Sequence, residues 1–312
     1  MSNFAIIYPG QGSQSLGMLS DLSEKFPQVK ETFNEASEIV NLDLWSLSQL
    51  GPERDLNITI NTQPIMLAAS ISIWRIWLKE GGAIPEIMAG HSLGEYSALV
   101  AAGSINFKDA VELVSFRGKL MQKAVPEGDG AMAAILGLTD FEVKRICEDA
   151  SQAQVVEAVN FNSPGQVVIA GNVDAVKRAI DLSKESGAKR AILLDVSVPS
   201  HCSLMNEAAT EIDSKLQKIC FSTPNIDILH NVNAKSIKDN KEIRNILKRQ
   251  LNSPVLWSQT IKKISDDGIK LFFEFGPGKV LSNLCRRIDK NIQAFSVNDF
   301  DSLNNALELT NV

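Results

Sequence analysis

Apolar residues in this chain gather in short runs, and longer stretches between the runs carry apolar positions every three or four residues. Short runs indicate buried strands, and the wider repeat indicates helices with one apolar face. Strands are predicted at 5–8, 87–89, 226–230, 271–274 and 293–297, and helices at 63–79, 107–124, 203–218 and 258–267. Because strands and helices alternate, we predict an α/β fold with a mostly parallel sheet covered by helices on both faces.

The middle of the chain has a different pattern. It predicts strands at 130–136, 155–160, 166–170 and 189–198, with helices at 140–150 and 173–186. This β-α-β-β-α-β order is ferredoxin-like. A Gly-Asp-Gly turn at 128–130 opens the segment and Pro199 closes it. We therefore predict a ferredoxin-like small domain (128–198) inserted into a larger α/β domain (1–127 and 199–312).

Composition excludes several classes of protein. A net charge of −6 without a basic tract argues against nucleic-acid binding. The four cysteines are scattered without metal-ligand spacing, and there are only three histidines, so no metal cofactor is predicted. The cysteine usage indicates a reducing compartment. With no signal peptide and no apolar run of membrane-spanning length, we expect a cytoplasmic protein.

A Gly-His-Ser-Leu-Gly pentapeptide at 90–94 is the clearest chemical signal. It follows a predicted strand and precedes the helix-like run 95–102, the context that makes the serine of G-x-S-x-G a nucleophile. Ser92 is the predicted nucleophile, and the Leu93 N–H is a predicted donor to an oxyanion. The alternative is a glycine-flanked turn whose serine caps the helix.

A second glycine-rich loop, Gly-Gln-Gly-Ser-Gln at 10–14, ends the first predicted strand. Ligands of α/β sheets bind at the carboxyl ends of strands. An oxyanion hole needs two donors, and we predict the Gln11 N–H as the second. A plain tight turn and a phosphate-binding loop are the alternatives, although Ser15 replaces the third glycine of G-x-G-x-x-G.

His201 is the predicted general base. Ser200 is a good N-cap for the predicted helix, which would place His201 in its first turn. The positive helix end disfavours imidazolium, so the ring would stay neutral and able to accept the serine proton. The alternative is a histidine that packs or caps at a hinge. His91 is expected to point away from the nucleophile, and His230 ends a strand.

Arg117 lies in the middle of the apolar stripe of the predicted helix 107–124, and no acid occupies the positions three or four residues away. A guanidinium that faces inward needs an anion. One hypothesis is a buried carboxylate from elsewhere in the chain. The other is a bidentate clamp on a substrate carboxylate, which suits the planar fork of arginine.

Over essentially its whole length the chain resembles malonyl-CoA:acyl-carrier-protein transacylases of type II fatty-acid synthesis. The resemblance rests on several motifs in a fixed order: 10–14, Thr-Gln-Pro at 62–64, 90–96, Arg-Gly at 117–118, Ser-Pro-Gly-Gln at 163–166, Val-Pro-Ser-His-Cys at 198–202, Gln-Leu at 250–251 with Pro-Val at 254–255, and Gly-Pro-Gly-Lys-Val-Leu at 276–281.

The resemblance implies an α/β-hydrolase-like core and a Ser92–His201 pair without an acidic third member. The Gln250 carbonyl would orient the His201 ring, with Asp195 as the rival. Oxyanion donors would be the N–H groups of Gln11 and Leu93.

The resemblance also implies how the substrate is bound. Arg117 would hold the malonyl carboxylate with Gln63 nearby, and Ser200 is of the small type seen in malonyl-selective members.

The implied reaction is ping-pong transfer of malonyl from coenzyme A to acyl carrier protein, without a cofactor of the enzyme's own. Acyl carrier proteins are acidic, so docking needs a basic patch, for which Lys189, Arg190, Arg286 and Arg287 are candidates. Three alternatives remain: a serine thioesterase or hydrolase, a malonyl or methylmalonyl transferase of a polyketide pathway, and a non-catalytic carrier-binding module.

Overall fold

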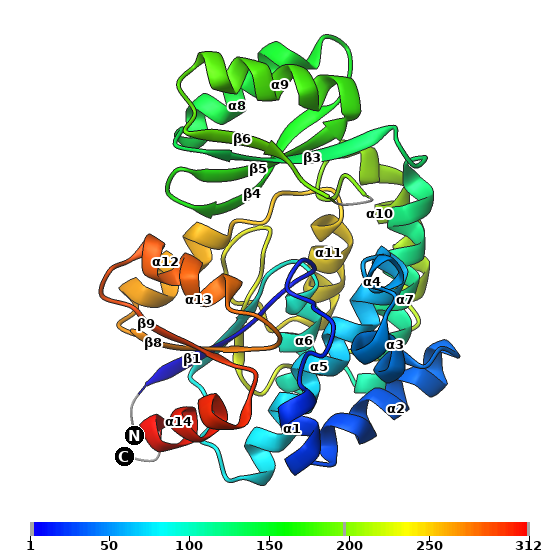
Figure 1. The fold of residues 1–312 in the computed structure, drawn as a ribbon, viewed down its shortest axis with the longest axis vertical. Coiled ribbons are helices and arrows are strands. Elements are labelled where there is room, and N and C mark those ends of the chain that lie inside the picture. The colour runs from blue at the N-terminus through cyan, green and yellow to red at the C-terminus, as the bar shows by residue number, and fades with distance from the viewer. Residues whose placement is uncertain (1–2, 196–197, 311–312) are drawn as a thin grey trace.

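Two sheets organise the protein (Figure 1), which is described by a computed structural model covering residues 3–195 and 198–310. The five-stranded sheet has the order β7-β2-β1-β8-β9, and every neighbouring pair is parallel. Its strands are β1 (Phe4–Tyr8), β2 (Ile87–Gly90), β7 (Asp227–Leu229), β8 (Leu271–Phe275) and β9 (Gln293–Val297). The predicted parallel sheet is confirmed, with strand ends within two residues of those expected.

Helices cover both faces of this sheet because its strands are apolar on both sides. Phe4, Ile6 and Tyr8 of β1 pack into the larger core, whereas Ala5 and Ile7 pack beneath α12 and α13. The helices of this part are α1 (Ser20–Lys25), α2 (Gln28–Val40), α3 (Leu44–Leu50), α4 (Glu53–Leu56), α5 (Thr59–Lys79), α6 (Gly94–Ala101), α7 (Phe107–Ala124), α10 (Asn206–Leu216), α11 (Asn240–Gln250), α12 (Trp257–Asp266), α13 (Val280–Ile288) and α14 (Phe300–Thr310).

The four-stranded sheet is antiparallel and has the order β4-β5-β3-β6. It consists of β3 (Gly130–Leu136), β4 (Val156–Ser163), β5 (Gln166–Asn172) and β6 (Arg190–Leu193), with helices α8 (Asp140–Ser151) and α9 (Val173–Glu185). The predicted ferredoxin-like order is confirmed. Strand β6 ends earlier than the predicted 189–198, of which 196–197 lie outside the described residues.

The two faces of the small sheet have different neighbours. One face packs against α8 and α9, and side chains such as Ala133 and Ile169 form its core. The other face, with Met132, Val168 and Ala170, turns toward the larger sheet and packs against Cys202. Figure 1 shows α8 and α9 on the outside of this sheet, away from the larger part.

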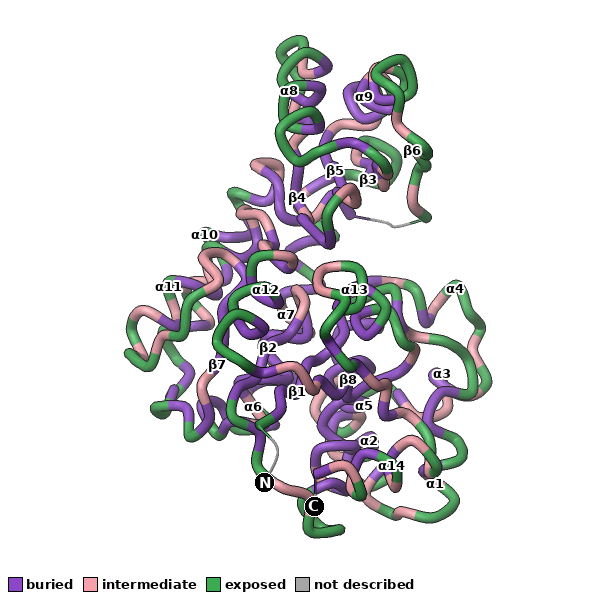
Figure 2. The backbone as a smooth tube through the Cα atoms, turned by 90° about the vertical axis from the view of Figure 1, so that its left-hand side faces the viewer, coloured by how far each residue is buried: buried purple, intermediate pink, exposed green. Residues whose placement is uncertain are grey.

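Main-chain hydrogen bonds join the two parts. The Val255 N–H donates to the Val159 carbonyl at 2.8 Å, and the Phe161 N–H donates to the Val255 carbonyl at 3.0 Å. Strand β4 thus runs beside a segment of the larger part, whereas β6 at the other edge is largely exposed (Figure 2). The division at 127/128 and 198/199 stays a prediction.

None of the helices in the described parts of the chain has the length and apolar character needed to cross a membrane.

Candidate active site

Ser92 occupies a sharp turn between β2 and α6, and the two flanking glycines allow it. A Cβ at Gly90 would lie 1.9 Å from the Gly94 carbonyl carbon, and a Cβ at Gly94 would lie 2.0 Å from the Tyr8 carbonyl oxygen. No larger residue fits at either place. Ser92 itself has φ 51°, in the left-handed region that non-glycine residues rarely adopt. The predicted strand–turn–helix context is therefore present.

Two side chains hold the Ser92 main chain in this conformation. The Ser92 N–H donates to Asn231 Oδ1 at 2.7 Å, and the Ser92 carbonyl accepts from Gln250 Nε2 at 3.0 Å. Strained backbone persists where the surroundings fix it from several sides. Both partners come from more than 130 residues further along the chain.

His201 is the imidazole that meets Ser92. Its Nε2 lies 2.7 Å from Ser92 Oγ, and its Nδ1 lies 2.7 Å from the Gln250 main-chain carbonyl. A carbonyl can only accept, so Nδ1 carries the proton and the Nε2 lone pair faces the hydroxyl. The implied Gln250 carbonyl is therefore the partner of the ring. The rival Asp195 is exposed.

Burial keeps the His201 ring neutral. The ring is 2% exposed, and burial together with the nearby Arg117 charge lowers the pKa of His201 to about 3. Hydrogen bonding to the Gln250 carbonyl opposes this shift without cancelling it. A neutral imidazole at pH 7 is the form that can accept a proton from Ser92.

The prediction that Ser200 caps a helix is wrong. His201 has φ 66° and belongs to a loop, and the first helical turn after it is the 3-10 helix η1 (Ser203–Met205). The carboxylate of Glu157, from β4, accepts from the Ser203 N–H and so occupies the place of a cap. His201 therefore owes its low pKa to burial and Arg117 rather than to a helix end.

Arg117 reaches the same serine from α7. Its side chain is 1% exposed, and its Nη2 donates to Ser92 Oγ at 3.2 Å and to Gln250 Oε1 at 3.1 Å. The other terminal nitrogen, Nη1, donates to Gln63 Oε1 at 3.0 Å, which brings Gln63 beside Arg117 as implied. Within residues 3–195 and 198–310, no carboxylate pairs directly with this guanidinium, and its Nε has no hydrogen-bond partner. A direct ion pair between Arg117 and an internal carboxylate is therefore not observed in these parts of the chain.

Ser92, His201 and Arg117 line one cavity of about 120 Å³, whereas Gln63 and Gln250 are fully buried and do not line it. The predicted residues Gln11, Leu93 and Ser200 also line it, and Ser200 Oγ lies 3.6 Å from Met132 Sδ. Among the described residues, neither the Gln11 nor the Leu93 main-chain N–H donates a hydrogen bond inside the protein. The full lining is Gln11, Thr59, His91, Ser92, Leu93, Arg117, Met121, Met132, Asn160, Leu194, Val198, Ser200 and His201.

The other two histidines are engaged elsewhere. His91 Nε2 lies 2.8 Å from Asn162 Oδ1, and the ring packs against Trp257. His230 is fully buried, with its Nδ1 2.7 Å from Glu95 Oε1. His91 lines the cavity but has no hydrogen bond to Ser92 Oγ among the described residues. His201 is the histidine that meets Ser92 in the parts of the chain that are described.

The sequence predictions missed the residues that hold the site together, chiefly Glu95 and Asn231. Glu95 directly follows the G-x-S-x-G motif and is an acid within an apolar helical run, which could have marked it as a buried group. Asn231 carries no local signal, because its bond to Ser92 spans 139 positions.

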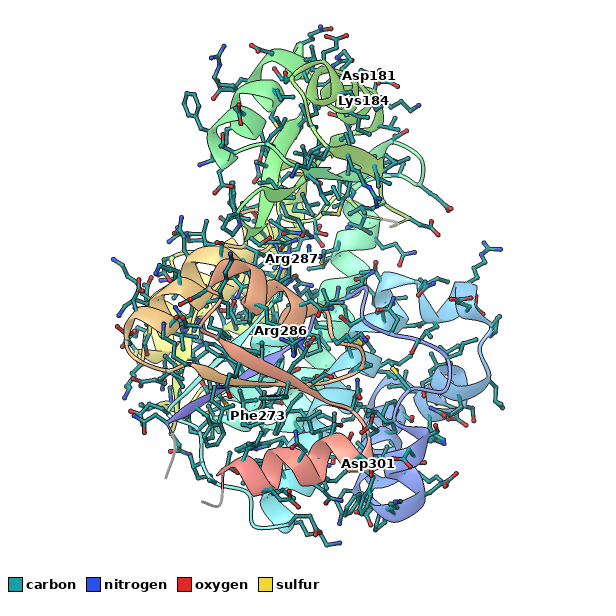
Figure 3. The ribbon with its side chains drawn as sticks, turned by 60° about the vertical axis from the view of Figure 1, so that its left-hand side comes forward. Asp181, Lys184, Phe273, Arg286, Arg287 and Asp301 are labelled. Atoms are coloured by element: carbon teal, nitrogen blue, oxygen red, sulfur yellow. The ribbon has the colours of Figure 1, made fainter. Side chains whose placement is uncertain are left out.

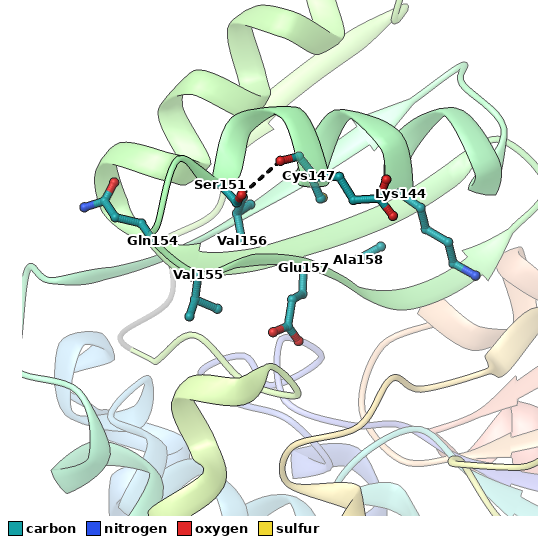
Figure 4. A pocket seen from close by; sticks show the side chains of 9 residues that line it. Lys144, Cys147, Ser151, Gln154, Val155, Val156, Glu157 and Ala158 are labelled. Carbon is teal, nitrogen blue, oxygen red and sulfur yellow. Dashed lines mark hydrogen bonds between the residues drawn. The ribbon is translucent and has the colours of Figure 1, made fainter.

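A second hollow, of about 380 Å³, lies between α8 and β4 on the small sheet (Figure 4). Lys144, Cys147 and Glu148 of α8 line it together with the start of β4. Figure 4 shows Glu157 pointing away from α8, toward the loop where it binds Ser203. None of the predicted site residues lines this hollow.

No group of three or more His, Cys, Asp or Glu side chains suited to a metal ion occurs in the described parts of the chain.

Comparison with known proteins identifies the family. Residues 5–298 match the model of the acyl transferase domain. A malonyl CoA-acyl carrier protein transacylase of Haemophilus influenzae is 54% identical, over 97% of this chain and 98% of its own. An acyl carrier protein S-malonyltransferase of Vibrio cholerae, 54% identical, superposes with a TM-score of 0.95 over 97% of this chain and 99% of its own.

A further solved structure holds a malonyl-transacylase in complex with a type II polyketide acyl-carrier protein. The match is 53% identical with a TM-score of 0.98, covering 99% of this chain and 100% of that one. The resemblance noted from the motifs is thereby confirmed: the chain belongs to the family of malonyl CoA-acyl carrier protein transacylases, within the acyl transferase domain family.

Proposed function

We infer that this protein is an [acyl-carrier-protein] S-malonyltransferase, which moves malonyl from coenzyme A to the pantetheine thiol of acyl carrier protein and so supplies fatty-acid synthesis. One observation carries the assignment of residues. Ser92 Oγ lies 2.7 Å from a neutral imidazole and 3.2 Å from a buried guanidinium that no carboxylate pairs in the described chain. The first group activates a hydroxyl, and the second suits an acyl group that ends in a carboxylate.

The first half-reaction makes a malonyl-serine ester. His201 Nε2 takes the Ser92 hydroxyl proton as Oγ bonds the thioester carbonyl carbon. The carbon–sulfur bond then breaks, and the thiolate of coenzyme A takes the proton from His201. A thiolate is a good leaving group because the pKa of a thiol is only about 8.5, so a histidine without an acidic partner is adequate.

The tetrahedral intermediate needs two donors for its oxyanion. We assign the Gln11 and Leu93 N–H groups to this role. Both residues line the cavity beside Ser92, and neither N–H is used inside the described protein.

Arg117 and Gln63 are assigned to the malonyl carboxylate. When a carboxylate enters, Arg117 can exchange its bonds to Ser92 Oγ and to the neutral amide oxygens for stronger charge-assisted ones. Ser200 and Met132 also line the cavity and so bound the space around the acyl chain.

The second half-reaction reverses the first with a new thiol. His201 takes the pantetheine thiol proton as the sulfur attacks the ester carbonyl. The bond to Oγ then breaks, and Ser92 recovers its proton from His201. The proposed reaction needs no cofactor of the enzyme's own, because both pantetheine thiols belong to the substrates.

Docking of the acidic carrier protein is assigned to exposed basic residues outside the cavity lining. Lys189, Arg190, Arg286 and Arg287 are all exposed. Figure 3 labels Arg287 where the two parts of the molecule meet, and its Nη1 donates to Gln166 Oε1 at 2.8 Å. Arg286 donates to the Ala294 carbonyl, so it is less free to meet a partner. All four cysteines are free, which suits the proposed location in the cytoplasm.

Incubation with radiolabelled malonyl-CoA tests this function. The enzyme alone is expected to carry label on Ser92, and added acyl carrier protein is expected to remove that label as malonyl-carrier. Release of free malonate at the rate of transfer would instead identify a thioesterase. Failure of malonyl-CoA to label Ser92 would contradict the assignment of the nucleophile.

A further inference from the structure

Glu95 is a fully buried acid at the start of α6, three residues after the nucleophile. Its carboxylate accepts from three donors. They are His230 Nδ1 at 2.7 Å, the Asn231 N–H at 3.1 Å and Gln250 Nε2 at 2.8 Å. A buried carboxylate is costly unless hydrogen bonds satisfy it, so this arrangement fixes its neighbours strongly.

Two of the three residues that donate to Glu95 also form hydrogen bonds to the turn that carries Ser92. Asn231 accepts from the Ser92 N–H at 2.7 Å and donates to the Gly90 carbonyl at 2.6 Å. Gln250 Nε2, which donates to Glu95, also donates to the Ser92 carbonyl at 3.0 Å. Both polar groups of Ser92's main chain are therefore held by side chains of residues that Glu95 binds, Asn231 through its main-chain N–H and Gln250 through its Nε2.

Gln250 carries the connection to the other groups of the site. Its Oε1 accepts from Arg117 Nη2, and its main-chain carbonyl accepts from His201 Nδ1. The orientation of the Gln250 side chain is set by Glu95, since an amide whose nitrogen faces a carboxylate must turn its oxygen the other way. Ser92, His201 and Arg117 thus all form hydrogen bonds to Gln250, whose side chain is held by Glu95.

The charge of Glu95 has a second effect, which is on Arg117. Arg117 is buried, and the negative charge of Glu95 supports its charged form, although burial lowers the pKa of Arg117. Glu95 forms no direct hydrogen bond to the guanidinium. An incoming carboxylate therefore displaces only neutral oxygens from the Arg117 N–H groups, while the buried cation has an anion nearby.

We propose that Glu95 is a positioning residue for acyl transfer, whose carboxylate holds the Ser92 turn in its strained conformation through Asn231 and Gln250. The proposal rests on the proposed function. The Ser–His pair has no acidic third member that binds the imidazole. Glu95 would instead act on the main chain of the nucleophile.

Glu95→Gln tests this with the smallest change in shape. A glutamine offers one acceptor oxygen and one NH₂ group. Its NH₂ group therefore either faces one of the three donors or requires His230 to move its ring proton to Nε2, which has no hydrogen-bond partner in the described chain. We expect kcat for malonyl transfer to fall ~30- to 100-fold, the scale of a small misplacement of reacting groups. The KM for malonyl-CoA is expected to stay within ~3-fold, because Arg117 keeps its N–H groups.

Glu274→Gln is the matched control. Glu274 is also fully buried, and its carboxylate accepts from the N–H groups of Leu281 and Ser282 and from the Ser282 hydroxyl. It anchors α13 and does not line the cavity. Both variants are expected to lower the unfolding temperature, but only Glu95→Gln is expected to lower kcat.

Reaction with a neutral sulfonyl fluoride measures the reactivity of Ser92 independently of malonyl-CoA binding. The reagent reacts with Ser92 without needing Arg117, so the rate of this reaction is expected to fall in Glu95→Gln by a factor similar to that in kcat. A folded Glu95→Gln protein with the kcat of Glu274→Gln would overturn the proposal. So would a rise in KM at unchanged kcat, since that pattern assigns Glu95 to substrate binding alone.

Glu95→Asp decides the question if the glutamine variant does not fold. Aspartate keeps the charge but is one methylene shorter, so it cannot reach both Asn231 and Gln250. We expect at least a ~10-fold loss of kcat with little change in KM, and wild-type kcat would overturn the proposal. If the wild-type enzyme forms no malonyl-serine, the proposed function fails, whereas the sulfonyl fluoride rates still test Glu95.

Discussion

The two sheets face one cavity but contribute different kinds of groups to it. The larger part supplies Ser92, His201 and Arg117, all joined by hydrogen bonds of 2.7 to 3.2 Å. The small sheet and its exit supply Met132, Asn160 and Leu194, which form a wall. Groups that move protons need fixed geometry, whereas a wall needs only shape. We therefore expect substitutions on the two sides to differ in size and in kind.

Ser92→Ala removes the proposed nucleophile and is expected to have the largest effect. Malonyl transfer should fall by at least about 10³-fold, because the remaining groups cannot form the covalent intermediate. Protein labelling by malonyl-CoA, read by mass after denaturation, is expected to disappear. Label retained on the Ser92→Ala protein would show that another residue is acylated. The larger part would then not be the side that supplies the nucleophile through Ser92.

Arg117→Ala is expected to change the choice of acyl group. Loss of charge-assisted bonds to the malonyl carboxylate, at about 1.5–3 kcal/mol, predicts a fall of ~10- to 100-fold in the malonyl-to-acetyl ratio of kcat/KM. Arg117→Lys serves as the control, since it keeps the charge but loses the planar fork and should fall less. An unchanged ratio in Arg117→Ala would contradict the carboxylate clamp.

The contrast between the two sides also marks what could be predicted from sequence. Ser92 could be predicted as a site residue because its motif is local: a strand, two close-packed glycines and a helix within about fifteen residues. Alternating strands and helices gave the parallel sheet, and the order of short elements gave the ferredoxin-like sheet. Arg117 could be predicted as a site residue because a charge on an apolar stripe conflicts with burial.

Hydrogen bonds between residues far apart in the chain could not be predicted from the sequence. Glu95 was missed, although it lies next to the motif, because its role depends on Asn231 and Gln250, 136 and 155 positions away. The Ser200 cap was wrong for a similar reason. Serine before a helical pattern favours an N-cap, but Glu157 of the small sheet fills that place and the chain turns left-handed at His201.

The pH profile tests how His201 is kept neutral. With its pKa lowered to about 3 by burial and by Arg117, the base stays neutral at pH 5, where a histidine of ordinary pKa 6.5 would be about 97% protonated. The acid limb of kcat/KM is therefore expected well below pH 6.5. In Arg117→Ala, followed with acetyl-CoA, it should move toward neutral, because one cause of the lowered pKa is removed.

Stability must be followed alongside that profile. The unfolded chain binds a proton at His201 more readily than the folded protein does, so this residue lowers stability as the pH falls from about 6.5 toward 3. An unfolding curve at each pH separates loss of fold from protonation of the base. An acid limb near pH 6.5 in folded wild-type enzyme would contradict the buried, neutral base.

Met132→Ala probes the wall and is expected to have the smallest effect. Met132 is 5% exposed, borders the cavity and contacts Ser200, so its truncation should widen the space beside the acyl chain. Malonyl transfer is expected to change less than ~3-fold, while the methylmalonyl-to-malonyl ratio of kcat/KM rises ~3- to 10-fold, the scale of one methyl group.

Val168→Ala is the matched control for that change. Val168 lies on the same face of the small sheet and is equally buried, but it does not line the cavity. Its truncation should lower stability without changing the acyl ratio. If Met132→Ala instead reduced malonyl transfer as strongly as Arg117→Ala, the small sheet would be positioning the reacting groups, and the division between a chemical side and a wall would fail.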